Sequence, residues 1–376
     1  MNFQPVERLA NSRLRNSVMP PRVQPSLPSQ PLHVLRTHTG AINTLAFSHS
    51  GGTYILTGSS DRQIHFSRTE PSASTSTTIS KSNTITKTTN DTSPQPPITT
   101  TPIQKYTSHG YPVLSITVTQ SNTHFASSSA DRSGPFLWDI QTPNTTLRRF
   151  GGNSPTPHTS RITCVTFTAN DEILVSGSDD RSVRLWDMKS RDSRPLMVLE
   201  EARDGISALV TRDTEIISGS TDGRIRTYDV RMGRCTVDVR PGPVTSLNLS
   251  RDGRTLLVGC LDGRIRYMDR ENGSCLRSFP PDSKMISDED GTGYVNKSLR
   301  LQSCLAQNDS LVLSGSESDG QVRAWDVTSG KQIGKIHISD ASKVISVVQW
   351  REGSDLEKRR GVWAAGGTEG VVKIYG

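Results

Sequence analysis

The chain has 376 residues, of which 32% are hydrophobic and 22% charged, and its formal net charge is +7. No apolar run approaches the ~18 residues that a membrane-spanning helix requires, and the N-terminal stretch lacks the apolar segment of a secretion signal. We therefore expect neither an integral membrane protein nor a secreted one.

Cysteine usage argues against disulfide and metal chemistry. The five cysteines are scattered and include no Cys-x-x-Cys pair: Cys164, Cys235, Cys260, Cys275 and Cys304. An odd number without paired spacing fits neither a disulfide framework nor a zinc site and suits a reducing compartment. We expect no metal and no cofactor.

The first segment, residues 1–31, carries four arginines against one glutamate and is predicted to be a disordered basic tail. It supplies +3 of the net charge, so much of the positive excess lies outside any folded face. Such a mild excess does not require a nucleic-acid partner, and direct nucleic-acid binding is not expected.

Internal repetition dominates the rest of the chain. Each copy has a short apolar run, small residues, an acidic residue in a two-residue turn and then alternating apolar residues, which predicts a strand–turn–strand unit. The copies span residues 55–67, 125–139, 174–187, 216–229, 256–269, 311–326 and 363–376. No helical periodicity of any length accompanies them.

The repeat length identifies the architecture. Without residues 1–31 and 68–104 there remain 308 residues, or 44 for each of seven copies. A repeat of ~40–45 residues with four strands is typical of a WD40 propeller blade. The name-giving dipeptide stands at Trp138-Asp139, Trp186-Asp187 and Trp325-Asp326. The chain therefore resembles the WD40-repeat family, and we predict an all-β, seven-bladed β-propeller.

Closure of the ring and two inserts complete the predicted organisation. The chain ends on the third strand of the seventh copy, so the N-terminal segment 32–37 is predicted to supply the fourth strand and close the ring. Residues 32–376 would form one domain. Within it, 68–104 is predicted as a disordered Ser/Thr/Pro-rich insert in blade one, and 280–293 as an acidic loop before blade six. Whether the first insert is phosphorylated or only a spacer stays open.

A histidine precedes the first strand of each of the first three blades, and each of these blades also has an aspartate in its turn. Such His/Asp pairs resemble those of catalytic sites. The WD40 resemblance instead implies a hydrogen-bonded relay of His, Ser, Asp and Trp that fixes the loops. The expected structural anchors are His38, His109, His158, Ser176, Asp61, Asp131, Asp180, Trp186, Asp222, Asp262, Asp319 and Glu369. Blades four and five lack the histidine, so their stability is expected to rest on packing. No nucleophile elbow or phosphate loop occurs, and no enzyme is expected.

Two sets of residues are candidate contacts for partners. Tyr228-Asp229-Val230-Arg231 is similar to the box by which many WD40 proteins dock on the adaptor of cullin-type ubiquitin ligases, with Arg231 as the exposed contact. Blade three carries a weaker version that ends at Lys189. Arginines near the hairpins could also form a basic rim for acidic partners, or pair with the many aspartates: Arg132, Arg181, Arg184, Arg224, Arg226, Arg264 and Arg266.

Residues 105–275 carry a closer resemblance. Segments 108–116, 199–209, 218–233 and 250–273 are similar to the mitogen-activated protein kinase organizer family of WD-repeat scaffolds. The resemblance implies a non-enzymatic, monomeric adaptor, cytoplasmic and nuclear, that assembles components of the extracellular-signal-regulated kinase cascade and of the spliceosome in pre-mRNA splicing. The alternative is a cullin-ligase substrate receptor that docks through Asp229 and Arg231. The partners' identity and the face that they use stay open.

Overall fold

The computed structural model describes residues 27–49, 52–69, 98–99, 101–131, 134–142, 145–152, 154–280, 294–340, 343–353 and 361–376. All regular elements within these ranges are β-strands. Among the same residues, no helix is long and apolar enough to cross a membrane. The predicted all-β fold class is confirmed.

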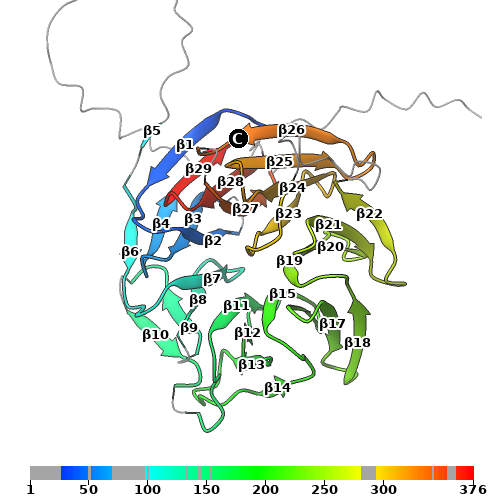
Figure 1. Ribbon diagram of the computed structural model, residues 1–376. Helices are drawn as coiled ribbons and strands as arrows, with labels where there is room; N and C mark the ends of the chain where they lie inside the picture. Colours follow the sequence, from blue (N-terminus) through cyan, green and yellow to red (C-terminus); the bar gives the residue numbers. More distant parts are fainter. Residues whose placement is uncertain are drawn as a thin grey trace, which may run out of the picture.

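Seven antiparallel sheets stand around a central axis as the blades of a propeller (Figure 1). Blade one is formed by β2 (Ile42–Phe47), β3 (Tyr54–Ser59), β4 (Ile64–Arg68) and β6 (Gln104–Tyr106). Blade two is formed by β7 (Val113–Val118), β8 (His124–Ser129), β9 (Phe136–Asp139) and β10 (Thr146–Arg149). Blade three is formed by β11 (Ile162–Phe167), β12 (Ile173–Ser178), β13 (Val183–Asp187) and β14 (Met197–Leu199).

The same order continues around the ring. Blade four is formed by β15 (Ile206–Arg212), β16 (Glu215–Ser220), β17 (Arg224–Asp229) and β18 (Arg234–Val239). Blade five is formed by β19 (Val244–Leu249), β20 (Thr255–Cys260), β21 (Arg264–Asp269) and β22 (Cys275–Phe279). Blade six is formed by β23 (Ser303–Ala306), β24 (Leu311–Gly315), β25 (Gln321–Asp326) and β26 (Gln332–His337).

Blade seven joins the two ends of the chain. Its strands are β27 (Ile345–Arg351), β28 (Val362–Gly367), β29 (Val371–Tyr375) and β1 (Pro31–Arg36). β1 runs antiparallel to β29, with Val34 opposite Lys373 and Leu35 opposite Val372. The predicted closure by an N-terminal strand is therefore confirmed. It pairs edges of the last sheet that would otherwise be exposed.

The edges of the expected tail and inserts are more ordered than the sequence suggested. Arg68 ends β4 and Gln104 begins β6, although both were assigned to the insert 68–104. Within that insert, β5 (Ile98–Thr99) adds a short parallel strand to the outer side of β1. Leu27 packs against the core of blades six and seven, and the carbonyl of Pro28 accepts a hydrogen bond from Trp363. Residues 1–26, 70–97 and 281–293 lie outside the described residues.

The core lies between neighbouring blades, where apolar side chains of one sheet face those of the next. The small residue that recurs in each repeat permits this contact. A Cβ atom on Gly177 would lie 2.6 Å from Ile206 Cγ2, and one on Gly219 would lie 2.5 Å from Val244 Cγ1. Because these distances are too short for any real Cβ atom, only glycine lets the first strand of the following blade approach so closely.

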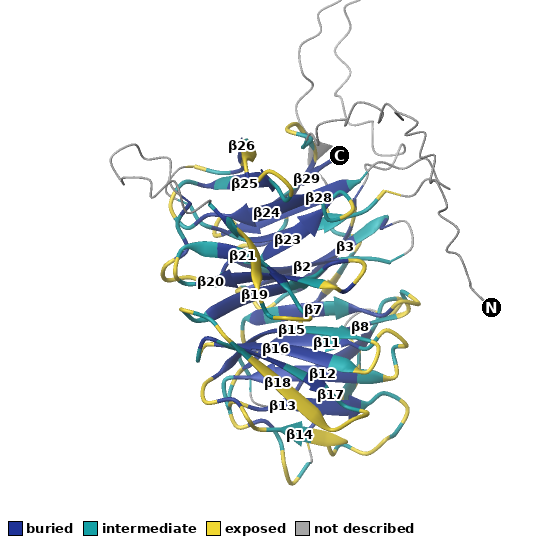
Figure 2. Cartoon of the chain, turned by 90° about the vertical axis from the view of Figure 1, so that its right-hand side faces the viewer, coloured by how far each residue is buried: buried dark blue, intermediate teal, exposed yellow. Residues whose placement is uncertain are grey.

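Burial differs between the strands of a blade. In blade four, the second strand β16 is mostly buried and the outer strand β18 is mostly exposed (Figure 2). Two faces result, because antiparallel strands alternate their turns. The "turn face" carries the turns between the second and third strands of each blade together with the loops that lead into the first strands. The "opposite face" carries the remaining turns of each blade.

Candidate functional site

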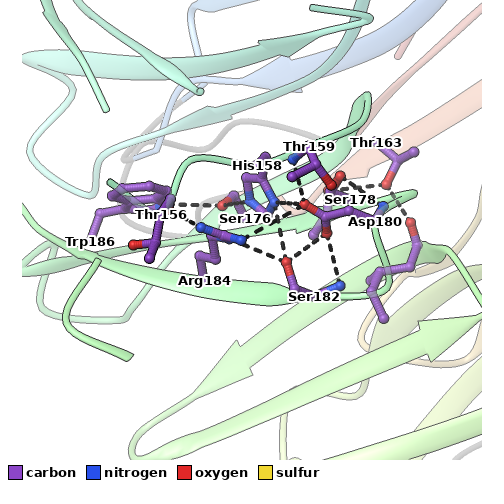
Figure 3. A network of polar contacts seen from close by, with 12 residues as sticks. Thr156, His158, Thr159, Thr163, Ser176, Ser178, Asp180, Ser182, Arg184 and Trp186 are labelled. Atoms are coloured by element: carbon purple, nitrogen blue, oxygen red, sulfur yellow. Dashed lines mark hydrogen bonds and ion pairs between the residues drawn. The ribbon is translucent and has the colours of Figure 1, made fainter. Parts of the chain in front are cut away.

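Blade three contains a continuous relay of buried side chains (Figure 3). His158 Nδ1 lies 2.8 Å from Asp180 Oδ2, and His158 Nε2 lies 2.8 Å from Ser176 Oγ. Trp186 Nε1 donates to the same serine oxygen at 2.8 Å. Asp180 also accepts the backbone N–H of Thr159 at 2.9 Å. The relay therefore fixes the loop before β11 against the β12–β13 turn.

The protonation state that satisfies this relay is a neutral His158. Burial lowers the pKa of His158 below its ordinary value, against the hydrogen bond and charge of Asp180. A neutral ring with its proton on Nδ1 donates to Asp180 and leaves Nε2 to accept from Ser176. Burial raises the pKa of Asp180, but the contacts with His158 and Ser182 outweigh it and keep that pKa below its ordinary value. Asp180 is thus a carboxylate with its acceptor sites occupied.

Blade one repeats the relay with a different third member. His38 Nδ1 lies 2.8 Å from Asp61 Oδ2, and His38 Nε2 lies 2.8 Å from Thr57 Oγ1. The ring of His65 stacks on that of His38, with centroids 3.8 Å apart. Burial lowers the pKa of His65 to about 3, so both stacked rings are neutral near pH 7. Ser67 occupies the position that tryptophan holds in blade three and is itself buried.

Blade two keeps the inner half of the relay. His109 Nε2 lies 2.7 Å from Ser127 Oγ, which also accepts from Trp138 Nε1 at 2.7 Å. His109 Nδ1 has no hydrogen-bond partner among the described residues. Asp131 lies at the equivalent turn, beside two residues outside the described ranges. Phe136 stacks on the imidazole at a centroid distance of 4.6 Å, so aromatic packing supports His109 here.

In blades four to six the acidic residue is held by an arginine four positions later, which is buried in blades four and six and half-buried in blade five. Arg226 Nη2 lies 2.7 Å from Asp222 Oδ2, and Arg323 Nη2 lies 2.5 Å from Asp319 Oδ2. Arg266 pairs with Asp262 in the same way. The expectation that blades four and five depend on packing alone was wrong, because an ion pair replaces the histidine. The pattern Asp-x-x-x-Arg was visible in the sequence and is the signal that would have found it.

Blade six has further anchors that the sequence interpretation missed. Tyr294 stands where other blades have histidine, and its hydroxyl lies 3.1 Å from Ser314 Oγ. Its ring meets Trp325 edge-on at 5.5 Å. Glu317 accepts the backbone N–H groups of Lys297, Ser298 and Leu299, which fixes the loop before β23. Two acids thus share the work in this blade, since Glu317 binds the preceding loop and Asp319 pairs with Arg323.

Glu369 in blade seven departs from the other anchors. It is exposed, and its carboxylate makes no hydrogen bond or ion pair within the described parts of the chain. Packing holds this blade instead, since Trp363 stacks on Tyr375 with ring centroids 4.0 Å apart. Within the part of the chain that the structure describes, Glu369 thus occupies the turn position of blade seven but does not bind a histidine, an arginine or the preceding loop, as the turn acids of other blades do.

The candidate basic rim on the turn face is smaller than the sequence suggested. Arg181 is exposed, with φ of 71°, and Arg224 and Arg264 are half-buried. Arg184 and Arg226 are buried side chains that contact turn aspartates, so their inclusion in a rim was wrong. Arg266 likewise faces Asp262. Arg132 lies outside the described residues.

The candidate docking box lies on the opposite face, in the turn between β17 and β18. Asp229 Oδ1 accepts the backbone N–H groups of Arg231 and Met232 at 3.0 Å each, which shapes the turn. Arg231 is exposed and adjoins a cavity of 250 Å³ whose apolar wall includes Ile173 and Val230. The weaker box of blade three differs, because Lys189 is paired with Glu172 at 2.5 Å.

The polar contacts of the His–Asp pairs stay within their own blades. The His–Asp contacts of blades one and three are enclosed by neighbouring donors and acceptors, so neither histidine is presented to a substrate. Among the described residues, no group of three or more His, Cys, Asp or Glu could hold a metal ion. The candidates that keep exposed surface are Arg231 on the opposite face and, on the turn face, the exposed Arg181 with the half-buried Arg224 and Arg264.

Comparison with known proteins agrees with this architecture. The family profile described as "WD domain, G-beta repeat" matches residues 29–66, 100–133 and 152–187. A second profile, described as "Anaphase-promoting complex subunit 4 WD40 domain", matches residues 203–288. The matches begin in the closing strand and continue into blade five.

Relatives with WD-repeat names match over different lengths. A protein of Dictyostelium discoideum called "WD repeat domain-containing protein 83 homolog" is 26% identical over 370 residues, which covers 91% of this chain and 96% of the relative. "WD repeat domain-containing protein 83" of Rattus norvegicus is 39% identical over 142 residues, covering 38% of this chain and 41% of the relative. The human protein of that name is 35% identical over 141 residues, again 41% of its length. The mammalian matches thus span less than half of either chain.

Proposed function

We propose, from the premise that this chain belongs to the WD40-repeat family, that it is a non-enzymatic scaffold holding several proteins at once. The observation that carries the proposal is the enclosure of the His–Asp pairs. The polar atoms of both pairs form hydrogen bonds that fix loops. The ring therefore offers two rigid faces instead of a catalytic centre. Rigid loops reduce the ordering cost of binding a partner.

The finer proposal concerns which partners are held. The resemblance to the mitogen-activated protein kinase organizer family supports components of the extracellular-signal-regulated kinase cascade, spliceosomal proteins, or both. The match to the Dictyostelium WD repeat domain-containing protein 83 homolog along nearly the whole chain supports a common ring architecture. We propose a monomeric ring that acts in cytoplasm and nucleus.

Purified partners provide the test. The full chain is immobilised, and the binding of purified cascade kinases and purified spliceosomal proteins is measured separately and then together. A scaffold binds two components in the same complex, and substitutions on one face remove one of them. Arg181→Glu with Arg224→Glu alters the turn face, and Arg231→Glu alters the opposite face. Binding of neither group by the wild-type chain would contradict the finer proposal.

A second candidate function, substrate receptor of a cullin-type ubiquitin ligase, is favoured by the surroundings of Arg231. The side chain is exposed at the rim of an apolar cavity, so a partner could place an apolar side chain in the cavity and a carboxylate on the guanidinium. The adaptor is expected to bind the wild-type chain and to lose at least ten-fold in affinity with Arg231→Ala. Arg234→Ala, an exposed arginine in the next strand, is the control. No adaptor binding by the wild-type chain would rule the candidate out.

A further inference from the structure

The first strands of the blades enclose a polar cavity on the axis of the ring. Its volume is 330 Å³, and hydroxyl, amide and aliphatic side chains line most of it. Arg300, in the loop before β23, is the only charged side chain among the described residues that line this cavity. A single cation in such a place requires explanation, because burying charge without a partner is costly.

Arg300 crosses the mouth of the cavity from blade six. Its Nη1 donates to the carbonyl oxygen of Thr163 at 2.9 Å, and its Nε donates to that of Thr245 at 3.4 Å. Both acceptors are neutral, and no carboxylate forms an ion pair with Arg300 among the described residues. Asp179, whose charge acts on the guanidinium, is engaged with Arg161 at 2.5 Å. The positive charge is therefore not neutralised.

The residue beneath the guanidinium carries an unsatisfied hydroxyl. Thr245 is 3% exposed and lines the cavity, yet its Oγ1 has no hydrogen-bond partner among the described residues. Hydroxyls at the equivalent positions of three other blades donate to the next blade: Thr163 to the carbonyl of Ile206, Ser207 to that of Val244 and Ser346 to that of Ile42. Leaving such a group unsatisfied in a buried place costs about 1–3 kcal/mol.

We propose that Arg300 and Thr245 together form a binding site for an oxyanion, a phosphate monoester or a carboxylate, at the turn-face mouth of the channel. The guanidinium would supply charge and remaining N–H donors, and the threonine hydroxyl would supply one more donor. Thr245 lies at the start of β19 and Arg300 in the loop before β23, both on the turn face, so an anionic side chain on a protein docked there could reach them. The site stands independently of the scaffold function.

Titration with simple anions tests the site. The melting temperature of the full chain is measured at pH 7 and constant ionic strength while chloride is replaced by inorganic phosphate, acetate or N-acetyl-phosphothreonine amide. Each bound anion raises the melting temperature with a saturable dependence on concentration. A response to phosphate and phosphothreonine identifies a phosphate monoester as the preferred ligand, and a larger response to acetate identifies a carboxylate. No saturable response to any of the three overturns the proposal.

Three variants assign the response to these residues. Arg300→Gln is expected to weaken anion binding at least ten-fold, whereas Arg203→Gln, an exposed arginine in the loop before β15 on the same face, leaves it unchanged. Thr245→Val removes the unsatisfied hydroxyl, so the chain remains folded and binds the anion more weakly. If Arg300→Gln does not fold, Thr245→Val decides. Unchanged anion affinity in Thr245→Val or in folded Arg300→Gln overturns the proposal.

Discussion

Arg226 and Asp222 form a buried ion pair across the β16–β17 hairpin, with Nη2 and Oδ2 2.7 Å apart and side chains 1% and 8% exposed. Asp222 also accepts the backbone N–H of Arg203, from the loop before β15. The pair therefore performs in blade four what histidine performs in blades one and three. Arg226 stands near the start of β17, and its long side chain reaches back to the carboxylate in the turn.

Arg226→Ala is expected to destabilise the chain by about 3–5 kcal/mol, because removing one partner leaves a buried carboxylate without its cation. Arg224→Ala, two residues earlier and half-buried, should change stability by less than about 0.5 kcal/mol. Urea denaturation followed by tryptophan fluorescence measures both. If the two substitutions lowered the free energy of unfolding equally, the ion pair would not contribute to stability as proposed.

Ser176→Ala is expected to lower stability by about 2–4 kcal/mol, since it leaves His158 Nε2 and Trp186 Nε1 without their shared partner. Ser121→Ala, an exposed serine in a turn, is the control and should be close to neutral. Thermal unfolding of the two variants gives the comparison. A stability like that of the wild type in Ser176→Ala would mean that water replaces the serine hydroxyl.

Leu35→Ala tests the closure of the ring. Leu35 is 1% exposed in β1, so truncating it should cost about 2–5 kcal/mol through lost burial and the cavity left behind. Leu32→Ala, in the same strand at 45% exposure, should cost less than about 1 kcal/mol. Limited proteolysis should also cut the Leu35 variant faster near its N-terminus. Similar costs for both leucines would argue against closure by this strand in solution.

Acidification should destabilise the ring through its buried histidines. Burial lowers the pKa of His109 to about 4, against the charge of Asp131. The unfolded chain then takes up the proton first as pH falls, so the stabilisation is complete above pH ~6.5 and decreases toward pH 4. The loss between pH 6.5 and 5 should reach about 2 kcal/mol for this histidine.

To check this dependence, the free energy of unfolding is measured between pH 7 and pH 5 for the wild type, His109→Gln and His337→Gln. The slope with pH should decrease in the His109 variant and remain unchanged in the control, because His337 is exposed. An unchanged slope in His109→Gln would place the acid sensitivity in other groups.

The features predicted correctly are those that each repeat carries within itself. Residues 174–187 specify a hairpin through alternating apolar side chains and a two-residue turn, and seven such units of 44 residues leave few alternatives to a propeller. The sequence indicates only that each repeat contains a small residue. The reason for glycine lies in the contact between Gly177 and Ile206, which joins two separate blades.

Contacts between distant segments escaped prediction for the same reason. Tyr294 contacts Ser314 and Trp325 in the folded blade six. This contact could not be predicted, because Tyr294 directly follows an inserted loop and does not match the histidine of the other repeats. Likewise, arginines that alternate along a strand look alike in sequence. In the folded blade, Arg226 is buried against Asp222, whereas Arg224 stays half-buried.

The sequence alone determined the fold class, the number of blades and the strand that closes the ring, because hydrophobic alternation and repeat length are local properties that recur seven times. Only the tertiary structure decided which charges are buried in pairs and which remain available. It placed Arg231 on the surface, and it brought Arg300 of blade six to Thr245 and Thr163 across the channel. These outcomes depend on how the blades face one another around the axis, and no single repeat encodes that geometry.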